Sequence, residues 1–204
     1  MTTTVRAMVR FAAATGCRPM EACLLRPRDL DRTDADVWIF SPMRHECEHH
    51  DQARRVFVGT KAQAAILPLL DRDPETFVFS PAESVNERRA MQRANRKIPV
   101  QPSQRNRSQG VQTFAERYDT NSFRKAIRHA VAAANKTAKK ADSDAAEIPV
   151  WSPNMLRHLA AMTITREHGV EHARAILGHA TIDATKHYLE RDAELARRVA
   201  AVIG

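Results

Sequence analysis

Two β-rich runs, set in a chain whose pattern is otherwise helical, restrict the possible folds more than any other feature of the sequence. The runs are Val37–Phe40 and Arg55–Val58, and a polar stretch separates them. Short runs of β-branched and aromatic residues on either side of a polar turn are typical of paired antiparallel strands. The sequence therefore predicts a mainly α fold with one small antiparallel sheet (α+β).

Helix-compatible segments lie on both sides of these runs, and glycines mark several of their ends. A glycine just past a helix can adopt the left-handed conformation that closes it, and Pro68 is expected to bend or end its own helix. Thr76–Phe79 predicts a further short strand or an extended lead into the next segment. The expected helices are Val5–Ala14 ended by Thr15-Gly16, Pro19–Leu25, Ala62–Leu70, Phe123–Ala138, Asn154–His168 ended by Gly169, Val170–Leu177 ended by Gly178, and Asp183–Val202 with Asp183 as N-cap.

The charge of the chain favours a polyanionic partner. Lysine and arginine number 32 against 24 acidic residues, a formal net charge of +8 over 204 residues. No apolar run is long enough to span a bilayer, and no signal-peptide pattern follows Met1, which favours nucleic acid over a membrane surface. The three cysteines have neither disulfide nor zinc-ribbon spacing, which indicates a reducing, cytoplasmic setting.

A strongly basic segment occupies residues 81–118. Its first part is compatible with a helix, and Ile98–Gly110 has the composition of a basic loop. Two interpretations stay open: a solvated linker, or a surface that contacts the DNA backbone. The candidate DNA-binding residues are Arg88, Arg89, Arg93, Arg96 and Lys97, with Arg105 and Arg107 in the loop.

Four short motifs occur in a fixed order along the chain. They are Thr15-Gly16-Cys17-Arg18 followed by Glu21 and Leu24, then Arg157-His158, then Leu177-Gly178-His179, and finally Tyr188. In this order and spacing they resemble the motifs of the tyrosine recombinase (phage integrase) family, over residues 5–195 apart from the basic insert. The resemblance predicts a tyrosine recombinase catalytic-domain-like fold.

The resemblance also implies a mechanism without metal, nucleotide or other cofactor. Arg18 and Arg157 would hold the phosphate oxygens, which suits a planar guanidinium that stays charged at any working pH. His179 would add a hydrogen bond to the same oxygens, and Tyr188 would attack phosphorus and form a 3′-phosphotyrosine. Taken singly, each residue also fits an ordinary structural role, as a surface arginine, a helix-capping histidine or a tyrosine at the edge of the core.

The sequence departs from the family pattern at two positions. Asn154 stands where the family usually has histidine, and asparagine donates a hydrogen bond but shuttles no proton. Glu46 aligns with the lysine that protonates the departing 5′-oxygen, and a carboxylate there repels the substrate. Arg44, His45 and Lys61 are the candidates to replace that lysine. A catalytically impaired DNA-binding module of the same fold is therefore the alternative to an active recombinase.

The same polar stretch contains a zinc-protease signature. His45-Glu46-Cys47-Glu48-His49 matches His-Glu-x-x-His, which binds zinc when a helix brings both histidines to one face. Because the match lies between two strand-like runs, a polar turn is the favoured interpretation and no metal site is assigned. A zinc-dependent hydrolase remains a third hypothesis.

The domain organisation follows from the position of the first motif. About seventeen residues precede Arg18, so we expect residues 1–204 to form a single catalytic domain with a basic insert at 81–118 and without the family's N-terminal core-binding domain. The resemblance implies double-stranded DNA as partner, a tetramer on DNA, and a prokaryotic, DNA-associated location. The last helix, Glu190–Val202, would dock on a neighbouring subunit or pack on its own core.

Overall fold

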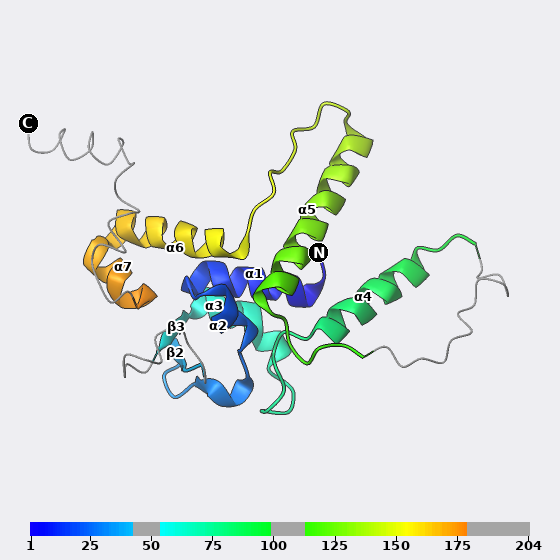
Figure 1. Ribbon diagram of the computed structural model, residues 1–204. Coiled ribbons are helices and arrows are strands. Elements are labelled where there is room, and N and C mark those ends of the chain that lie inside the picture. Colours follow the sequence, from blue (N-terminus) through cyan, green and yellow to red (C-terminus); the bar gives the residue numbers. More distant parts are fainter. Residues whose placement is uncertain (43–53, 99–112, 179–204) are drawn as a thin grey trace, which may run out of the picture.

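The computed structural model describes residues 1–42, 54–98 and 113–178 (Figure 1). Helices dominate this part of the chain, and one small sheet lies near its N-terminal half, as the sequence predicted. The elements are α1 (Thr3–Thr15), α2 (Pro19–Cys23), the 3-10 turn η1 (Pro27–Asp29), β1 (Leu30–Asp31), β2 (Val37–Phe40), β3 (Val56–Gly59), α3 (Thr60–Ile66), the 3-10 turn η3 (Leu67–Leu69), α4 (Pro81–Ala94), α5 (Thr120–Ala141), α6 (Pro153–His168) and α7 (Val170–Leu177).

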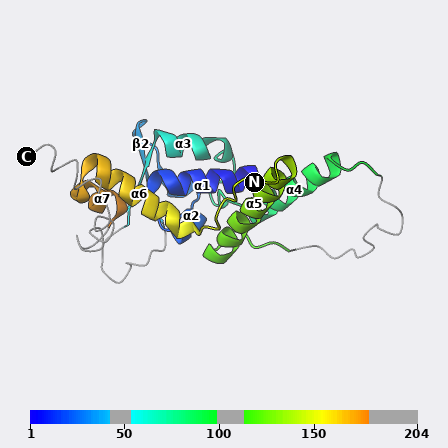
Figure 2. The same cartoon turned by 90° about the horizontal axis from the view of Figure 1, so that it is seen from above.

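Helix α1 is the centre of the hydrophobic core. It packs against α3 and α6, and Figure 2 shows it running through the middle of the molecule. Phe11 is fully buried, with its ring centroid 6.4 Å from that of Phe40 in β2 and 6.2 Å from that of Phe79 before α4. The first helix, the sheet and the segment that leads into α4 therefore share one core.

The sheet is antiparallel with strand order β1-β2-β3. Val37 pairs with Gly59 and Phe40 with Val56, which confirms the two predicted strands and their pairing. Strand β1 was not predicted, because two residues carry no periodicity. Its register is set by the neighbouring strand, through the pairs Leu30–Phe40 and Asp31–Ile39.

Residues 76–79 do not form the short strand that was one of the two expectations for them. The Val78 N–H donates a single bond of 2.9 Å to the Leu25 carbonyl, and no ladder extends it. Val78 and Phe79 are nevertheless buried. The β-type composition of this segment thus reflects burial in the core, and a strand would need a partner edge as well.

Pro68 and the glycines lie at the helix ends that the sequence predicted for them. Helix α3 ends at Ile66, and Pro68 lies in the 3-10 turn that follows. Gly16 closes α1 at φ 64° and Gly178 closes α7 at the same angle, while Gly169 at φ 90° separates α6 from α7. The predicted helix beginning at Asp183 lies outside the described residues.

Candidate active site

Arg157 joins the ends of two helices that are far apart in the sequence. Its side chain extends from α6 and is buried, with 5% of the residue exposed. Nη1 donates to the Gly16 carbonyl at 2.8 Å and Nη2 donates to the Leu177 carbonyl at 3.0 Å. Both carbonyls lie at helix C-termini, where the backbone carries partial negative charge that attracts a guanidinium. One arginine therefore connects the three motifs around Gly16, Arg157 and Leu177.

Close packing at Gly16 supports this junction. A Cβ at Gly16 would lie 2.6 Å from Leu177 Cδ2 and 3.1 Å from the Ala160 Cβ, so no larger residue fits without movement. The positive φ adds a second reason for glycine at this position. The Thr-Gly motif therefore ends α1 and also lets α7 approach it.

Glu21 lies between two arginines. Its Oε1 accepts from Arg18 Nη1 at 3.2 Å and from Arg54 Nε at 3.0 Å, while Oε2 accepts the Arg18 backbone N–H at 2.7 Å. The glutamate is buried with 2% exposed, and the Arg18 side chain retains 18% exposure. We call Arg18, Glu21, Arg54 and Arg157 the arginine cluster; its formal charge is positive.

The electrostatics keep Glu21 ionised. Burial by itself raises the pKa of a carboxyl group, but Arg54 and Arg18 outweigh that effect and hold the pKa of Glu21 below its ordinary value of 4.5. Burial raises the pKa of the neighbouring Cys17 thiol to about 12, so that thiol stays protonated near neutral pH. The cluster therefore keeps one carboxylate against three guanidinium groups, an arrangement that suits an anionic substrate.

Asn154 lies on the exposed side of α6, one turn before Arg157. Its Nδ2 is 3.0 Å from Nε2 of the exposed His158. An imidazole thus lies beside the position where the family usually has histidine. A catalytic part for Asn154 stays a prediction.

His179 and Tyr188 lie outside the described residues, as do Arg44, His45 and Glu46 of the predicted turn and Arg105 and Arg107 of the basic loop. Their predicted roles stay predictions. The zinc hypothesis based on His45 and His49 is untested for the same reason. Across residues 1–42, 54–98 and 113–178, no group of three or more His, Cys, Asp or Glu side chains is placed to hold a metal ion.

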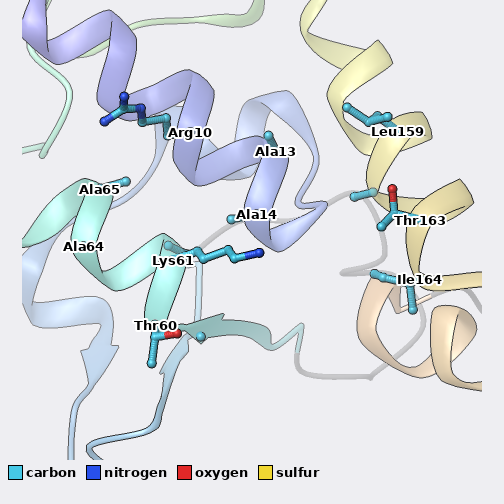
Figure 3. Close-up of a pocket in the computed structure, with 13 residues that line it drawn as sticks. Arg10, Ala13, Ala14, Thr60, Lys61, Ala64, Ala65, Leu159, Thr163 and Ile164 are labelled. Carbon is cyan, nitrogen blue, oxygen red and sulfur yellow. The ribbon is translucent and has the colours of Figure 1, made fainter. Parts of the chain in front are cut away.

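Lys61, one of the candidates to replace the family lysine, lines a pocket of about 680 Å³ between α1, α3 and α6. Figure 3 shows its side chain reaching from the first turn of α3 into this space, with Arg10 on α1 nearby and Leu159 and Ile164 on α6 opposite. The residues that line the pocket include none of the arginine cluster. The pocket and the cluster are therefore separate features.

The five candidate DNA-binding residues are all exposed at the far end of α4 and just beyond it. Helix α4 leads away from the body of the molecule on the side opposite α7 (Figure 1). We call residues 88–97 the basic arm. Its arginines and lysine are Arg88, Arg89, Arg93, Arg96 and Lys97.

Arg54 was not singled out from the sequence, although strand alternation carried the signal. Residues two apart in a strand share a face, so Arg54 is in phase with Val56 and Val58, while Arg55 is in phase with Phe57. The structure buries Val56 and Val58 and leaves Arg55 and Phe57 exposed. An inward-facing arginine could have been predicted from that register.

An arginine-rich, buried cluster at the junction of three ordered motifs defines a candidate phosphate-binding site on a mainly helical domain. The phage integrase family model matches residues 1–194, and the chain belongs to that family. A search of curated protein sequences gives no significant match.

Solved structures of low sequence identity share the fold. The XerA recombinase has 22% identity and a TM-score of 0.57, and the match covers 98% of this chain and 56% of that one. The Tn1549 transposon integrase (residues 82–397, in complex with circular intermediate DNA) has 17% identity and a TM-score of 0.58, with coverage of 97% and 59%. XerH bound to its difH substrate has 17% identity and a TM-score of 0.52, with coverage of 100% and 49%.

The chain thus spans about half to three fifths of the length of these recombinases. The predicted fold class, a tyrosine recombinase catalytic domain, is confirmed. Among the helices of the described residues, none is long and apolar enough to cross a membrane.

Proposed function

We propose that this chain is the catalytic domain of a site-specific DNA recombinase that cleaves and rejoins DNA strands through a 3′-phosphotyrosine on Tyr188. The observation that supports this most is the contact of Arg157 with the Gly16 and Leu177 carbonyls. That guanidinium joins three motifs, of which the first and the last are more than a hundred residues apart in the sequence. Unrelated structural roles for each motif would give no reason for this convergence.

The chemistry assigns a different part to each arginine. In phosphoryl transfer, negative charge builds on the non-bridging oxygens, and fixed guanidinium groups stabilise it without reorganising. Arg18 is the more exposed arginine, and we propose that it takes the phosphate oxygens directly. Arg157 donates a hydrogen bond to the carbonyl of Leu177, which lies two residues before His179. Arg157 would thereby fix the start of the segment that carries this histidine to the same phosphate.

The cleavage step forms one bond and breaks another. The Tyr188 hydroxyl loses its proton as its oxygen attacks phosphorus, the bond from phosphorus to the 5′-oxygen breaks, and that oxygen takes up one proton as it leaves, so the step is balanced in protons. Arg44, His45 and Lys61 are the candidates to supply the proton; Lys61 lines the pocket that contains none of the arginine cluster, so its position gives this role no support. No metal or other cofactor is part of the proposal.

The partner in this proposal is double-stranded DNA, bound by a tetramer in a prokaryotic cytoplasm. The basic arm would contact the backbone, because exposed lysines and arginines displace counterions from phosphates. Residues 1–204 would act as a single catalytic domain with its basic insert at 81–118.

A catalytically impaired DNA-binding module is the second candidate. Asn154 and His158 favour it, because the position of the family histidine holds an amide that occupies the neighbouring imidazole. Such a module would bind DNA with unchanged phosphate contacts and form no covalent product.

Trapping of a covalent adduct separates the two. The full chain is incubated with a pool of nicked duplexes from the source genome, in which a cleaved strand is lost and religation is blocked. Tyr188→Phe is the test variant, and Tyr118→Phe is the matched control, because Tyr118 is the other tyrosine of the chain and is buried. We expect an adduct with wild type and Tyr118→Phe and none with Tyr188→Phe. DNA binding without any adduct would favour the impaired module.

A further inference from the structure

Arg54 is a buried arginine on the inner side of the sheet. It lies two residues before the start of β3, in phase with the buried Val56 and Val58, and 8% of the residue is exposed. Burial of a guanidinium is unfavourable unless the site gives it strong partners, and an apolar residue in this position would stabilise the fold at least as well. Stability alone therefore gives no good account of an arginine here.

Its contacts connect two parts of the arginine cluster. Nε donates to Glu21 Oε1 at 3.0 Å, the same oxygen that accepts from Arg18 Nη1 at 3.2 Å. Glu21 is thus held from one side by Arg54 and in turn holds the backbone and side chain of Arg18 from the other. Displacement of Arg54 would free the carboxylate that orients Arg18.

The other end of the guanidinium lies against the Leu177-Gly178 turn. A Cβ at Gly178 would fall 2.2 Å from Arg54 Nη1, a separation that only glycine permits. Within the part of the chain that the structure describes, Nη2 is buried without a hydrogen-bond partner. A buried donor left unpaired costs free energy, so Nη2 adds to the unfavourable burial of this arginine.

We infer that Arg54 is a positioning residue of the proposed active site, which fixes Arg18 through Glu21 and lies against the turn that leads to His179. The inference rests on the proposed function and adds a residue to it. Arg54 acts through Glu21 and Gly178 and does not itself need to reach the DNA. Loss of its side chain should slow cleavage while DNA binding persists.

The test compares Arg54→Gln and Arg54→Lys with Arg55→Gln in the full chain. Arg55 is the matched control, because it is the next residue, loses the same charge and is exposed. The measured quantities are the single-turnover rate constant for adduct formation on a nicked duplex, the Kd for that duplex, and the melting temperature. For Arg54→Gln we expect the rate constant to fall about 100-fold, as for a misplaced catalytic group. We expect its Kd to stay within about three-fold of wild type.

The pH profile of the rate constant gives a readout that a merely structural role would not change. Among residues 1–42, 54–98 and 113–178, the charged groups that act on Glu21 are Arg54 and Arg18, and the Cys17 thiol stays protonated. Without Arg54 the Glu21 carboxyl stays buried, so its pKa rises. As the pH falls, Glu21 then becomes protonated and releases Arg18 at a higher pH than in the wild type. The acid limb of the profile should therefore move to higher pH in Arg54→Gln, return towards wild type in Arg54→Lys, and stay in place in Arg55→Gln.

Three results would overturn the inference. The first is a wild-type rate and pH profile in Arg54→Gln. The second is a fall in the rate constant of Arg54→Gln that is equalled by the fall in its DNA affinity and is accompanied by a lower melting temperature. The third applies where Arg54→Gln does not fold, and is a loss of rate in Arg54→Lys that is accompanied by a similar fold-loss of DNA affinity, with the acid limb unmoved. Absence of an adduct with the wild-type chain would overturn the proposed function and this role with it, whereas equal adduct formation by wild type and Arg54→Gln removes the role alone.

Discussion

The arginine cluster and the basic arm use the same type of residue in opposite ways. In the cluster, Arg157 and Arg54 are buried, and each donates hydrogen bonds to fixed acceptors in other parts of the chain. In the arm, Arg93 and its neighbours are exposed along one helix that leads away from the core. Figure 1 places the arm on the side opposite α7, so the two regions are spatially distinct.

The difference matches two different tasks on a polyanion. Stabilising the transition state of phosphoryl transfer requires charges whose positions are fixed before the substrate arrives. Binding a duplex of any sequence requires charges that reach phosphates and release counterions, and precise placement adds little. We therefore expect changes in the cluster to alter folding stability and the rate of cleavage, and changes in the arm to alter affinity and its dependence on salt.

The largest effect on stability is expected for Arg157→Met. The variant removes two charged hydrogen bonds and leaves the Gly16 and Leu177 carbonyls without their donor, so the free energy of unfolding should fall by about 4 kcal/mol. Urea denaturation measures it. The exposed Arg166 on the same helix is the control, and Arg166→Met should change the value by less than about 0.5 kcal/mol. Equal effects of the two variants would contradict the distinction between buried and exposed arginines.

A glycine series separates backbone strain from packing at the helix junction. Gly16→Ala meets both a positive φ and the Leu177 side chain, and should destabilise the fold by about 3 kcal/mol. Gly169→Ala meets open space around its Cβ, but φ 90° and ψ 167° are almost confined to glycine, so about 2 kcal/mol is expected from strain alone. Gly59→Ala meets neither and should stay within about 0.5 kcal/mol of wild type. Thermal unfolding gives the ranking, and a Gly16→Ala no worse than Gly169→Ala would show that α7 does not pack there as described.

Glu21→Gln should show a stability effect that depends on pH. The pKa of Glu21 is lowered in the folded chain, so its stabilising contribution is present above its ordinary value of 4.5 and is lost as the pH falls through the folded value. We expect a loss of about 2 kcal/mol at neutral pH. The gap between wild type and variant should narrow as the pH falls below 4.5. A gap that stays constant with pH, measured by urea denaturation, would argue against an ionised Glu21.

Changes in the basic arm should have the smallest effect on folding. The triple variant Arg93→Gln, Arg96→Gln, Lys97→Gln should unfold within about 0.5 kcal/mol of wild type, because all three side chains are exposed. Its DNA affinity should fall, and the slope of log Kd against log salt should decrease by up to about 3. Fluorescence anisotropy at several salt concentrations measures both. An unchanged slope would favour the solvated-linker interpretation of this segment.

Local signals in the sequence sufficed for most of the fold. Gly16 and Gly178 correctly predicted the ends of α1 and α7, because the left-handed conformation that follows a helix strongly favours glycine. Strand β1 was missed because its two residues depend on Phe40 and Ile39 for their conformation. For residues 76–79 the sequence left a strand and an extended lead into α4 both open, since burial and strand formation favour the same side chains.

The candidate site could be predicted as an ordered set of motifs but not as a geometry. Nothing in the sequence links Arg157 to the carbonyls of Gly16 and Leu177, because those contacts depend on how α1, α6 and α7 pack. Arg54 lay within reach of prediction, through its phase with Val56 and Val58. That Arg54 and Arg18 share one oxygen of Glu21 could be learned only from the tertiary structure.

The most direct test of the central claim is single-turnover adduct formation by Arg157→Lys and by the triple arm variant on the same nicked duplex. Arg157→Lys keeps the charge and loses the fork that spans two carbonyls. If the cluster acts on the transition state and the arm on binding, Arg157→Lys lowers the maximal rate with little change in Kd, and the arm variant raises Kd with an unchanged maximal rate. A maximal rate in Arg157→Lys equal to that of wild type would contradict the assignment of the arginine cluster as the active site.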